Sequence, residues 1–175
     1  MPDNKYDRPI VAISACLMGQ NVRYDGDHQY NELIESTLKP IVQITTFCPE
    51  VSAGLGTPRP PINLLVHDSK SNYKTEDILA VGVENPSLDV TAALTKTSEL
   101  YIRLFEHVDG IVFKARSPSC GLNDTPVLAG SQLTAGRGLF ARIITEALPG
   151  IAVIDELDFA DKLLRKNFIE TITSP

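Results

Sequence analysis

Hydrophobic and polar positions divide the chain into short apolar runs and longer stretches with helical spacing. Runs rich in β-branched residues and bounded by turn residues predict strands, at about 9–14, 41–47, 62–66, 78–83, 110–114 and 151–154. Apolar positions at helical spacing predict helices, at about 31–38, 89–108, 137–148 and 156–170. This alternation predicts an α/β fold, a three-layer, Rossmann-like, mainly parallel sheet with helices on both faces.

Three of the predicted strands run directly into loops that carry a cysteine. The strands at about 9–14, 41–47 and 110–114 precede Cys16, Cys48 and Cys120, respectively. Ligands of open α/β sheets bind at the carboxyl ends of the strands. We therefore expect the three sulfur atoms to meet at one site, although they are far apart in the sequence.

The segments between these elements indicate how the chain is organised. Residues 1–8 are expected to form a flexible tail, and the polar stretch at 68–74 suggests an excursion such as a hairpin. The loop at 48–61 is long and rich in Pro and Gly, which is typical of a functional loop. A length of 175 residues is typical of one domain with a core of its own, here 1–175.

Composition limits the classes of partner. The chain has 16 Lys and Arg against 22 Asp and Glu, a net charge of −6, which argues against binding to polymeric nucleic acid or an anionic membrane. It has no apolar run of about 18 residues and no apolar segment at the N-terminus like that of a signal peptide. We expect a cytoplasmic protein, either a monomer or a homodimer, that acts on a small molecule.

The cysteines have two interpretations. Each thiol alone could be a small packing residue, but three at strand ends favour a shared site rather than a disulfide framework. Their intervals, 48 − 16 = 32 and 120 − 48 = 72 residues, lack the paired spacing of structural zinc sites. Three thiolates plus one open position fit a catalytic zinc or a cubane iron–sulfur cluster. The spacing does not choose between these two.

Several short motifs, in order, resemble the thiouracil desulfurase (TudS) family, whose domain was long catalogued as one of unknown function. The resemblance covers about 10–155 and includes every cysteine. The motifs are Ser14–Gly19, Val22–Gly26, Cys48–Glu50, Pro58–Pro61, Asp89–Thr91 and Arg116–Gly121.

The resemblance implies a 4Fe-4S cluster held by Cys16, Cys48 and Cys120, with one iron open to substrate. It implies non-redox desulfuration of 2-thiouracil, 4-thiouracil or 4-thiouridine monophosphate, which gives the oxo base and hydrogen sulfide. In this pattern Glu50 is the general base and acid, and Ser117 orients the substrate. The alternatives for these two residues are an ion pair of Glu50 with Arg59 and a simple turn at Ser117.

Basic residues flank the cysteine loops and suggest a local site for an anion. We expect Arg23, Arg59, Lys114 and Arg116 to bind the phosphate of a thiolated nucleotide. Gly136–Gly138, before a predicted helix, could add backbone donors, while Asp25 is expected to close an Asp-Gly turn. Two other functions stay open: a zinc-dependent hydrolase with the same three cysteines, and a non-catalytic module that binds sulfur or a nucleotide.

Overall fold

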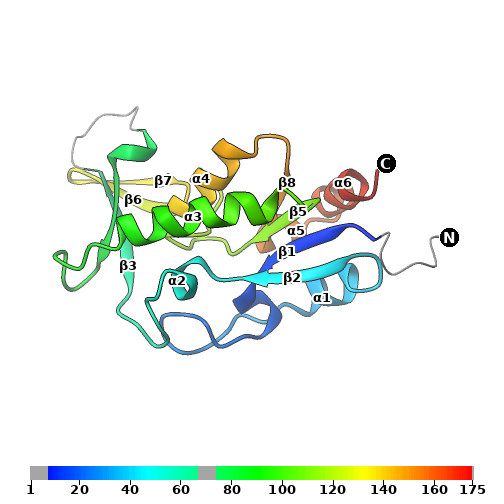
Figure 1. Ribbon diagram of the computed structural model, residues 1–175, viewed down its shortest axis with the longest axis horizontal. Coiled ribbons are helices and arrows are strands. Elements are labelled where there is room, and N and C mark those ends of the chain that lie inside the picture. The colour runs from blue at the N-terminus through cyan, green and yellow to red at the C-terminus, as the bar shows by residue number, and fades with distance from the viewer. Residues whose placement is uncertain (1–7, 67–73, 175) are drawn as a thin grey trace.

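The computed structural model describes residues 8–66 and 74–174, and within them eight strands form two sheets of four (Figure 1). The first sheet has the order β2-β1-β5-β8, and all of its pairings are parallel. Its strands are β1 (Ile10–Ser14), β2 (Gln43–Phe47), β5 (Gly110–Phe113) and β8 (Ala152–Asp155). All four lie within one or two residues of the predicted strands.

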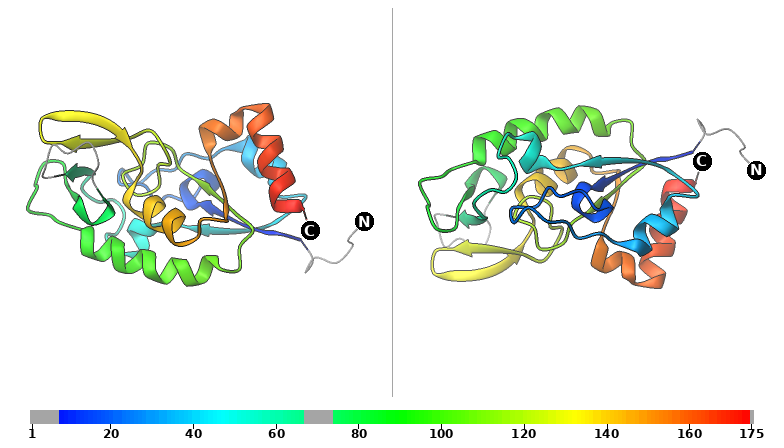
Figure 2. Two further views of the ribbon diagram at one scale, coloured as in Figure 1. Left: turned by 90° about the horizontal axis from the view of Figure 1, so that it is seen from above. Right: turned by 90° about the horizontal axis from the view of Figure 1, so that it is seen from below.

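Both faces of the first sheet are covered by helices. Successive side chains of a strand point to opposite sides of the sheet, so its buried strands present apolar side chains on both faces. In β1, Val11 and Ile13 pack into one apolar cluster and Ala12 into another. Helices from different parts of the chain complete these clusters (Figure 2). They are α1 (Glu32–Leu38), α5 (Glu156–Ala160) and α6 (Lys162–Thr173) on one face, and α3 (Thr91–Phe105) and α4 (Leu139–Ala147) on the other. The predicted three-layer α/β arrangement is confirmed.

The second sheet is the main difference from the predicted fold. It has the order β4-β3-β6-β7, in which β3 and β6 are parallel and both outer pairs are antiparallel. Its strands are β3 (Ile62–Val66), β4 (Ile78–Gly82), β6 (Thr125–Ala129) and β7 (Gln132–Gly136). The first two were predicted as strands, and their antiparallel pairing fits the expected hairpin. The connecting residues 67–73 lie outside the described part of the chain, as do residues 1–7 of the tail predicted at 1–8.

Helix α3 joins the two sheets, since it runs across both of them (Figure 1). Near its start Leu94 packs in the core of the second sheet, and at its end Phe105 packs against the first. The predicted helix at 89–108 is therefore present with shorter ends. Helix α4 spans the two sheets in the same way, because Leu139 packs in the core of the second sheet and Phe140 packs against the first.

The prediction of one continuous helix at 156–170 is wrong. The chain breaks at Asp161, whose backbone is extended and whose carboxylate accepts hydrogen bonds from the amides of Leu163 and Leu164. Aspartate in this role is a strong N-cap, which favours a new helix start over continuation of the old helix. Two helices, α5 and α6, result.

The order of the first sheet places the cysteine loops side by side. Strands β2, β1 and β5 are neighbours, and the loop that follows each of them carries one of the cysteines. The turn after β1 is the short 3₁₀ helix η2 (Ala15–Met18), and the chain after β2 forms α2 (Pro49–Ser52). A further 3₁₀ helix, η3 (Thr75–Asp77), precedes β4. Among the described helices none is long and apolar enough to cross a membrane.

Candidate active site

One cavity of about 410 Å³ lies where the three cysteine loops meet the start of β3. Cys16, Cys48 and Cys120 all line it. So do the other predicted site residues Glu50, Ser117, Arg23, Arg59, Lys114 and Arg116, whereas Asp25 and Gly136–Gly138 are not among the lining residues. The fold thus gathers into one cavity residues that are up to about a hundred positions apart.

Burial is the main influence on the ionisation of the three thiols, of which Cys16 and Cys120 are buried and Cys48 is half-buried. Burial raises the pKa of Cys16 to about 11, although the nearby ammonium of Lys114 opposes this rise. Burial also raises the pKa of Cys48, and it raises that of Cys120 well above the ordinary value, with the charges of Cys48 and Glu50 adding to it. Without a metal the three groups are therefore thiols at neutral pH. Metal binding must displace their protons.

Glu50 is a buried carboxylate with both oxygens occupied. It follows Pro49 in α2, and Pro at the first turn and an acidic residue there both favour a helix start. Its Oε1 accepts a hydrogen bond of 2.7 Å from Ser119 Oγ, and its Oε2 accepts one of 2.7 Å from Arg59 Nε. The ion pair with Arg59, one of the two interpretations of Glu50, is thus present in the structure.

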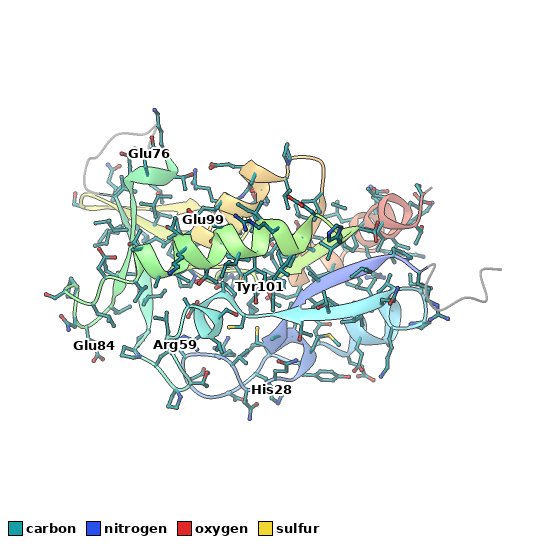
Figure 3. The ribbon with its side chains drawn as sticks, viewed as in Figure 1. His28, Arg59, Glu76, Glu84, Glu99 and Tyr101 are labelled. Carbon is teal, nitrogen blue, oxygen red and sulfur yellow. The ribbon has the colours of Figure 1, made fainter. Side chains whose placement is uncertain are left out.

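Arg59 connects Glu50 to the loop that follows Cys16. Its Nη1 donates to the carbonyl of Val22 at 2.8 Å and to that of Gly56 at 2.9 Å. The sulfur of Cys48 also lies 3.8 Å from the carbonyl oxygen of Val22. Arg59 lies on the segment that follows α2, below that helix in the view of Figure 3.

These contacts form a buried network of three side chains, Arg59, Glu50 and Ser119, which we call the three-loop network. Arg59 reaches the loop after β1, Glu50 belongs to the loop after β2, and Ser119 belongs to the loop after β5. Its ion pair is almost fully buried, with 5% of the Arg59 side chain and 11% of the Glu50 side chain exposed. The network therefore links the three loops that carry the cysteines.

The opposite side of α2 is held by an aromatic cluster. The hydroxyl groups of Ser52 and Tyr101 lie 2.9 Å apart, and Figure 3 shows Tyr101 on the side of α3 that faces α2. The ring of Tyr101 also packs at 6.0 Å from that of Phe47, the last residue of β2. Cys48 and Glu50 consequently sit on a short segment that is fixed from both sides.

The Cys120 loop is shaped by its own polar groups. Ser117 Oγ accepts hydrogen bonds from the amides of Cys120 at 3.0 Å and Ser119 at 3.2 Å. The turn interpretation of Ser117 is thus observed, and the hydroxyl still lines the cavity. A serine hydroxyl accepts two hydrogen bonds and donates one. Its proton remains available for a bound molecule.

The start of α4 also supports this loop. The amides of Gly138, Leu139 and Ala141 donate to the carbonyls of Gly121, Pro118 and Ser119 at 2.8–2.9 Å. A side chain at Gly138 would place its Cβ 2.5 Å from the carbonyl oxygen of Ser119. Gly138 therefore serves the close approach of helix and loop, and its amide is not directed at a phosphate.

Each of the four basic residues is paired with a carboxylate. The pairs are Arg23 with Asp25 at 3.0 Å, Arg59 with Glu50 at 2.7 Å, Lys114 with Glu156, and Arg116 with Asp124 at 3.3 Å. The pairs of Arg59 and Lys114 are buried, whereas 74% of the Arg116 side chain is exposed. A phosphate would have to compete with these carboxylates.

Three residues of the site escaped the sequence analysis: Ser119, Glu156 and Asp124. Glu156 binds both the ammonium of Lys114 and, at 2.6 Å, the amide of Ala115. Asp124 holds the amide of Arg116, which has a positive φ of 59°. For Ser119 the available signal was its place beside Cys120, but its partner is 69 residues away.

The arrangement of the three thiols limits which inorganic group the cavity could hold. Among the described residues, no group of three or more His, Cys, Asp and Glu side chains is arranged to hold a metal ion. The three thiols nevertheless share one cavity and influence one another's ionisation. In a cubane 4Fe-4S cluster each thiolate binds a different iron, so the thiols need not converge on one point. Soft sulfur donors around a common cavity fit such a cluster.

Comparisons with known proteins also support a site for an iron–sulfur cluster. The sequence profile of the 2-thiouracil desulfurase family matches residues 11–156, a range that includes all three cysteines and Glu50. A Bacillus subtilis (strain 168) protein described as uncharacterized protein YbbK is 28% identical over 167 residues, which cover 88% of this chain and 100% of that protein. The solved structure of the [4Fe-4S]-dependent thiouracil desulfidase TudS superposes with a TM-score of 0.66 at 28% identity, over 91% of this chain and 99% of that one.

Proposed function

Because this chain belongs to the 2-thiouracil desulfurase family, we propose that it is a desulfidase that replaces the sulfur of a thiolated pyrimidine with oxygen. The proposed reaction is non-redox: water and the thione give the oxo base and hydrogen sulfide. The observation that supports it most is the presence of three thiols, two of them buried and one half-buried, and one buried carboxylate in a single cavity. That combination supplies both a site for a cluster and a group that can move protons.

We propose a 4Fe-4S cluster as the cofactor, held by Cys16, Cys48 and Cys120, with its fourth iron open. When bound, it supplies a soft Lewis acid for the thione sulfur, which makes the ring carbon easier to attack. The solved structure that this chain resembles is described as [4Fe-4S]-dependent. Lys114, paired with Glu156, keeps a cation beside Cys16 and so offsets part of the negative charge of the thiolates.

Glu50 is the proposed proton carrier of the reaction. It takes one proton from the attacking water and returns it to the sulfur. As the C–S bond breaks, it carries the second proton from the hydroxyl on the ring carbon to the departing sulfur, so that both protons of water end in hydrogen sulfide. Ser119 and Arg59 each donate to one carboxylate oxygen, which fixes the orientation of the group in the cavity wall. We assign both residues to positioning.

Ser117 is the proposed hydrogen-bond donor to the substrate. Two backbone amides already occupy its oxygen, so the hydroxyl proton is directed elsewhere. An oxo or ring-nitrogen acceptor of the pyrimidine would receive it.

We propose that Arg116, whose side chain is 74% exposed, and Arg23, whose side chain is 22% exposed, bind a phosphate when the substrate is a nucleotide. Arg59 and Lys114 are less suited to this role, because their carboxylate partners, Glu50 and Glu156, are only 11% and 10% exposed. Loss of the partner would leave such a carboxylate with little water around it. The partners of Arg23 and Arg116 are 39% and 37% exposed, so water can replace the lost contact. The original expectation of four phosphate ligands is thereby narrowed to two.

Anaerobic reconstitution with iron and sulfide, followed by assays with 2-thiouracil, 4-thiouracil and 4-thiouridine monophosphate, tests the proposal. We expect equal amounts of sulfide and oxo base from at least one of them. A zinc-loaded protein that desulfurates, while the iron-loaded protein does not, would support the hydrolase alternative. Binding of the thiones without sulfide release by fully loaded protein would support the non-catalytic module.

A further inference from the structure

Tyr24 lies at the mouth of the cavity with a large part of its surface free. It lines the cavity, and 44% of the residue is exposed. Phe47, another aromatic residue of the lining, is buried beneath the cysteine loops with only 3% exposed. Of these two rings, only that of Tyr24 offers a surface to an incoming molecule.

The position of Tyr24 is fixed through both its backbone and its ring. Its carbonyl accepts a hydrogen bond of 2.9 Å from the amide of Arg59. The guanidinium of Arg23 lies over the ring, 5.5 Å from the centroid. That guanidinium is itself held by both carboxylate oxygens of Asp25, at 3.2 and 3.0 Å. Arg23, Tyr24 and Asp25, which we call the rim triplet, thus form one preorganised unit.

The turn that follows Tyr24 explains how the three consecutive residues of the rim triplet come into contact. Asp25 also accepts a hydrogen bond from the amide of Asp27, and Gly26 adopts a φ of 81°. Such an Asx turn with glycine reverses the chain tightly. The side chains on either side of Tyr24 are therefore brought together beside its ring.

A rigid aromatic ring at the mouth of a cavity suits a flat, unsaturated heterocycle. Stacking between an aromatic side chain and a base tolerates different bases, because every base has a π face. Removal of such a side chain typically weakens binding by about 5- to 150-fold. We propose that Tyr24 stacks on the pyrimidine ring of the substrate and so selects aromatic thiones. This inference rests on the proposed function.

The exposure of Tyr24 is not by itself a reason to assign it to substrate binding, because exposed tyrosines are common on protein surfaces. Tyr30, six residues after Tyr24 in the same connecting segment, is 47% exposed and is absent from the cavity lining. Its hydroxyl donates to Glu35 at 2.6 Å. Tyr30 is thus a matched control: the same residue type and a similar exposure, placed elsewhere.

The test uses cluster-loaded protein and two readouts. The first is KM and kcat for 4-thiouracil, and the second is the dissociation constant for uracil, measured by calorimetry. For Tyr24→Ala we expect KM and the uracil dissociation constant to rise at least five-fold, with kcat within about three-fold of the parent, because stacking holds substrate and transition state alike. Tyr24→Phe should restore the affinity. Tyr30→Ala should leave every constant unchanged.

Several outcomes would overturn the proposal. Unchanged KM and uracil affinity in Tyr24→Ala would show that the ring does not contact the substrate. Equal losses in Tyr24→Phe and Tyr24→Ala would assign the effect to the hydroxyl. If Tyr24→Ala does not load iron, the comparison of Tyr24→Phe with Tyr24→Leu decides in its place, and equal uracil affinities would reject stacking. Failure of the parent protein to release sulfide would reject the proposed function instead. The dissociation constants for uracil would still show whether Tyr24 contacts the pyrimidine ring.

Discussion

The inner wall of the cavity and its rim are both built from paired charges, but they differ in burial. On the wall, Arg59 and Glu50 are 5% and 11% exposed, whereas at the rim 74% of Arg116 and 37% of Asp124 are exposed. Losing one partner of a buried pair leaves a charge without water or counter-ion, which is costly. Losing one partner of an exposed pair costs little, because water replaces it. The wall can therefore hold the site rigid, while the rim can exchange its partners for a ligand.

The two regions also differ in how the chain builds them. The wall joins residues from three separate loops, since Glu50 and Ser119 are 69 positions apart. The rim pairs are local: Arg23 and Asp25 are two positions apart, and Arg116 and Asp124 are eight apart. The wall thus depends on the whole fold, and the rim depends mainly on individual turns.

The largest effect is expected from the thiols of the wall. Cys16→Ser, Cys48→Ser and Cys120→Ser should each reduce the iron content after reconstitution to a small fraction of the parent value and abolish sulfide release, because a hydroxyl does not replace a soft thiolate. Iron analysis and circular dichroism check the loss and the fold. A folded variant with parent-like iron content would remove that cysteine from the ligand set.

Neutralising the carboxylate of the wall should affect the reaction more than the cofactor. For Glu50→Gln we expect kcat to fall by about 10²- to 10⁴-fold, the usual contribution of a general base or acid. Steady-state kinetics of preparations with matched iron content measure the effect. Parent-like kcat in an iron-loaded variant would exclude Glu50 from proton transfer.

Removal of the cation of the wall should reduce stability. Arg59→Met leaves Glu50 buried without its counter-ion, so we expect the free energy of unfolding to fall by about 3 kcal/mol or more. Arg137→Met is the control, because the guanidinium of Arg137 donates to two neutral oxygens, the carbonyl of Leu122 and the hydroxyl of Thr145. Urea unfolding of the reduced, metal-free proteins measures both. Equal losses in the two variants would contradict the assigned role of the buried ion pair.

The same contrast explains what the sequence could predict. The strands of the first sheet carry dense apolar runs, such as Ile10–Ser14, so the strands were predicted. Their positions in turn predicted that the cysteines after them would share one site. Strands β6 and β7 were missed, because Pro126 interrupts the first and the second is mostly exposed, which leaves too few apolar positions to detect. Their pairing depends on the assembled second sheet.

The residues of the site were predicted in part as well. The cysteines, Glu50 and three of the basic residues lie in the recognised motifs, Lys114 lies two positions before one, and all of them line the cavity. The bond between Ser119 and Glu50 could not be predicted, since it joins loops that only the parallel order β2-β1-β5 brings together. Nor does a sequence show that each basic residue has its own carboxylate, because Glu156 is 42 positions from Lys114.

The smallest effect is expected at the rim. Arg116→Ala should raise KM for 4-thiouridine monophosphate by about two- to five-fold, the value of an exposed charge pair, and leave KM for 4-thiouracil unchanged. Arg103→Ala, which removes an exposed arginine of α3 outside the cavity lining, is the control. An equal change for nucleotide and free base would contradict a phosphate contact by Arg116.

The central claim is that Cys16, Cys48 and Cys120 together hold an iron–sulfur cluster. The most direct measurement is the content of iron, acid-labile sulfide and zinc per chain after anaerobic reconstitution. The account predicts about four irons and about four sulfides per chain, with all of them lost when the three cysteines are replaced together. Retention of a single zinc and no labile sulfide would contradict it.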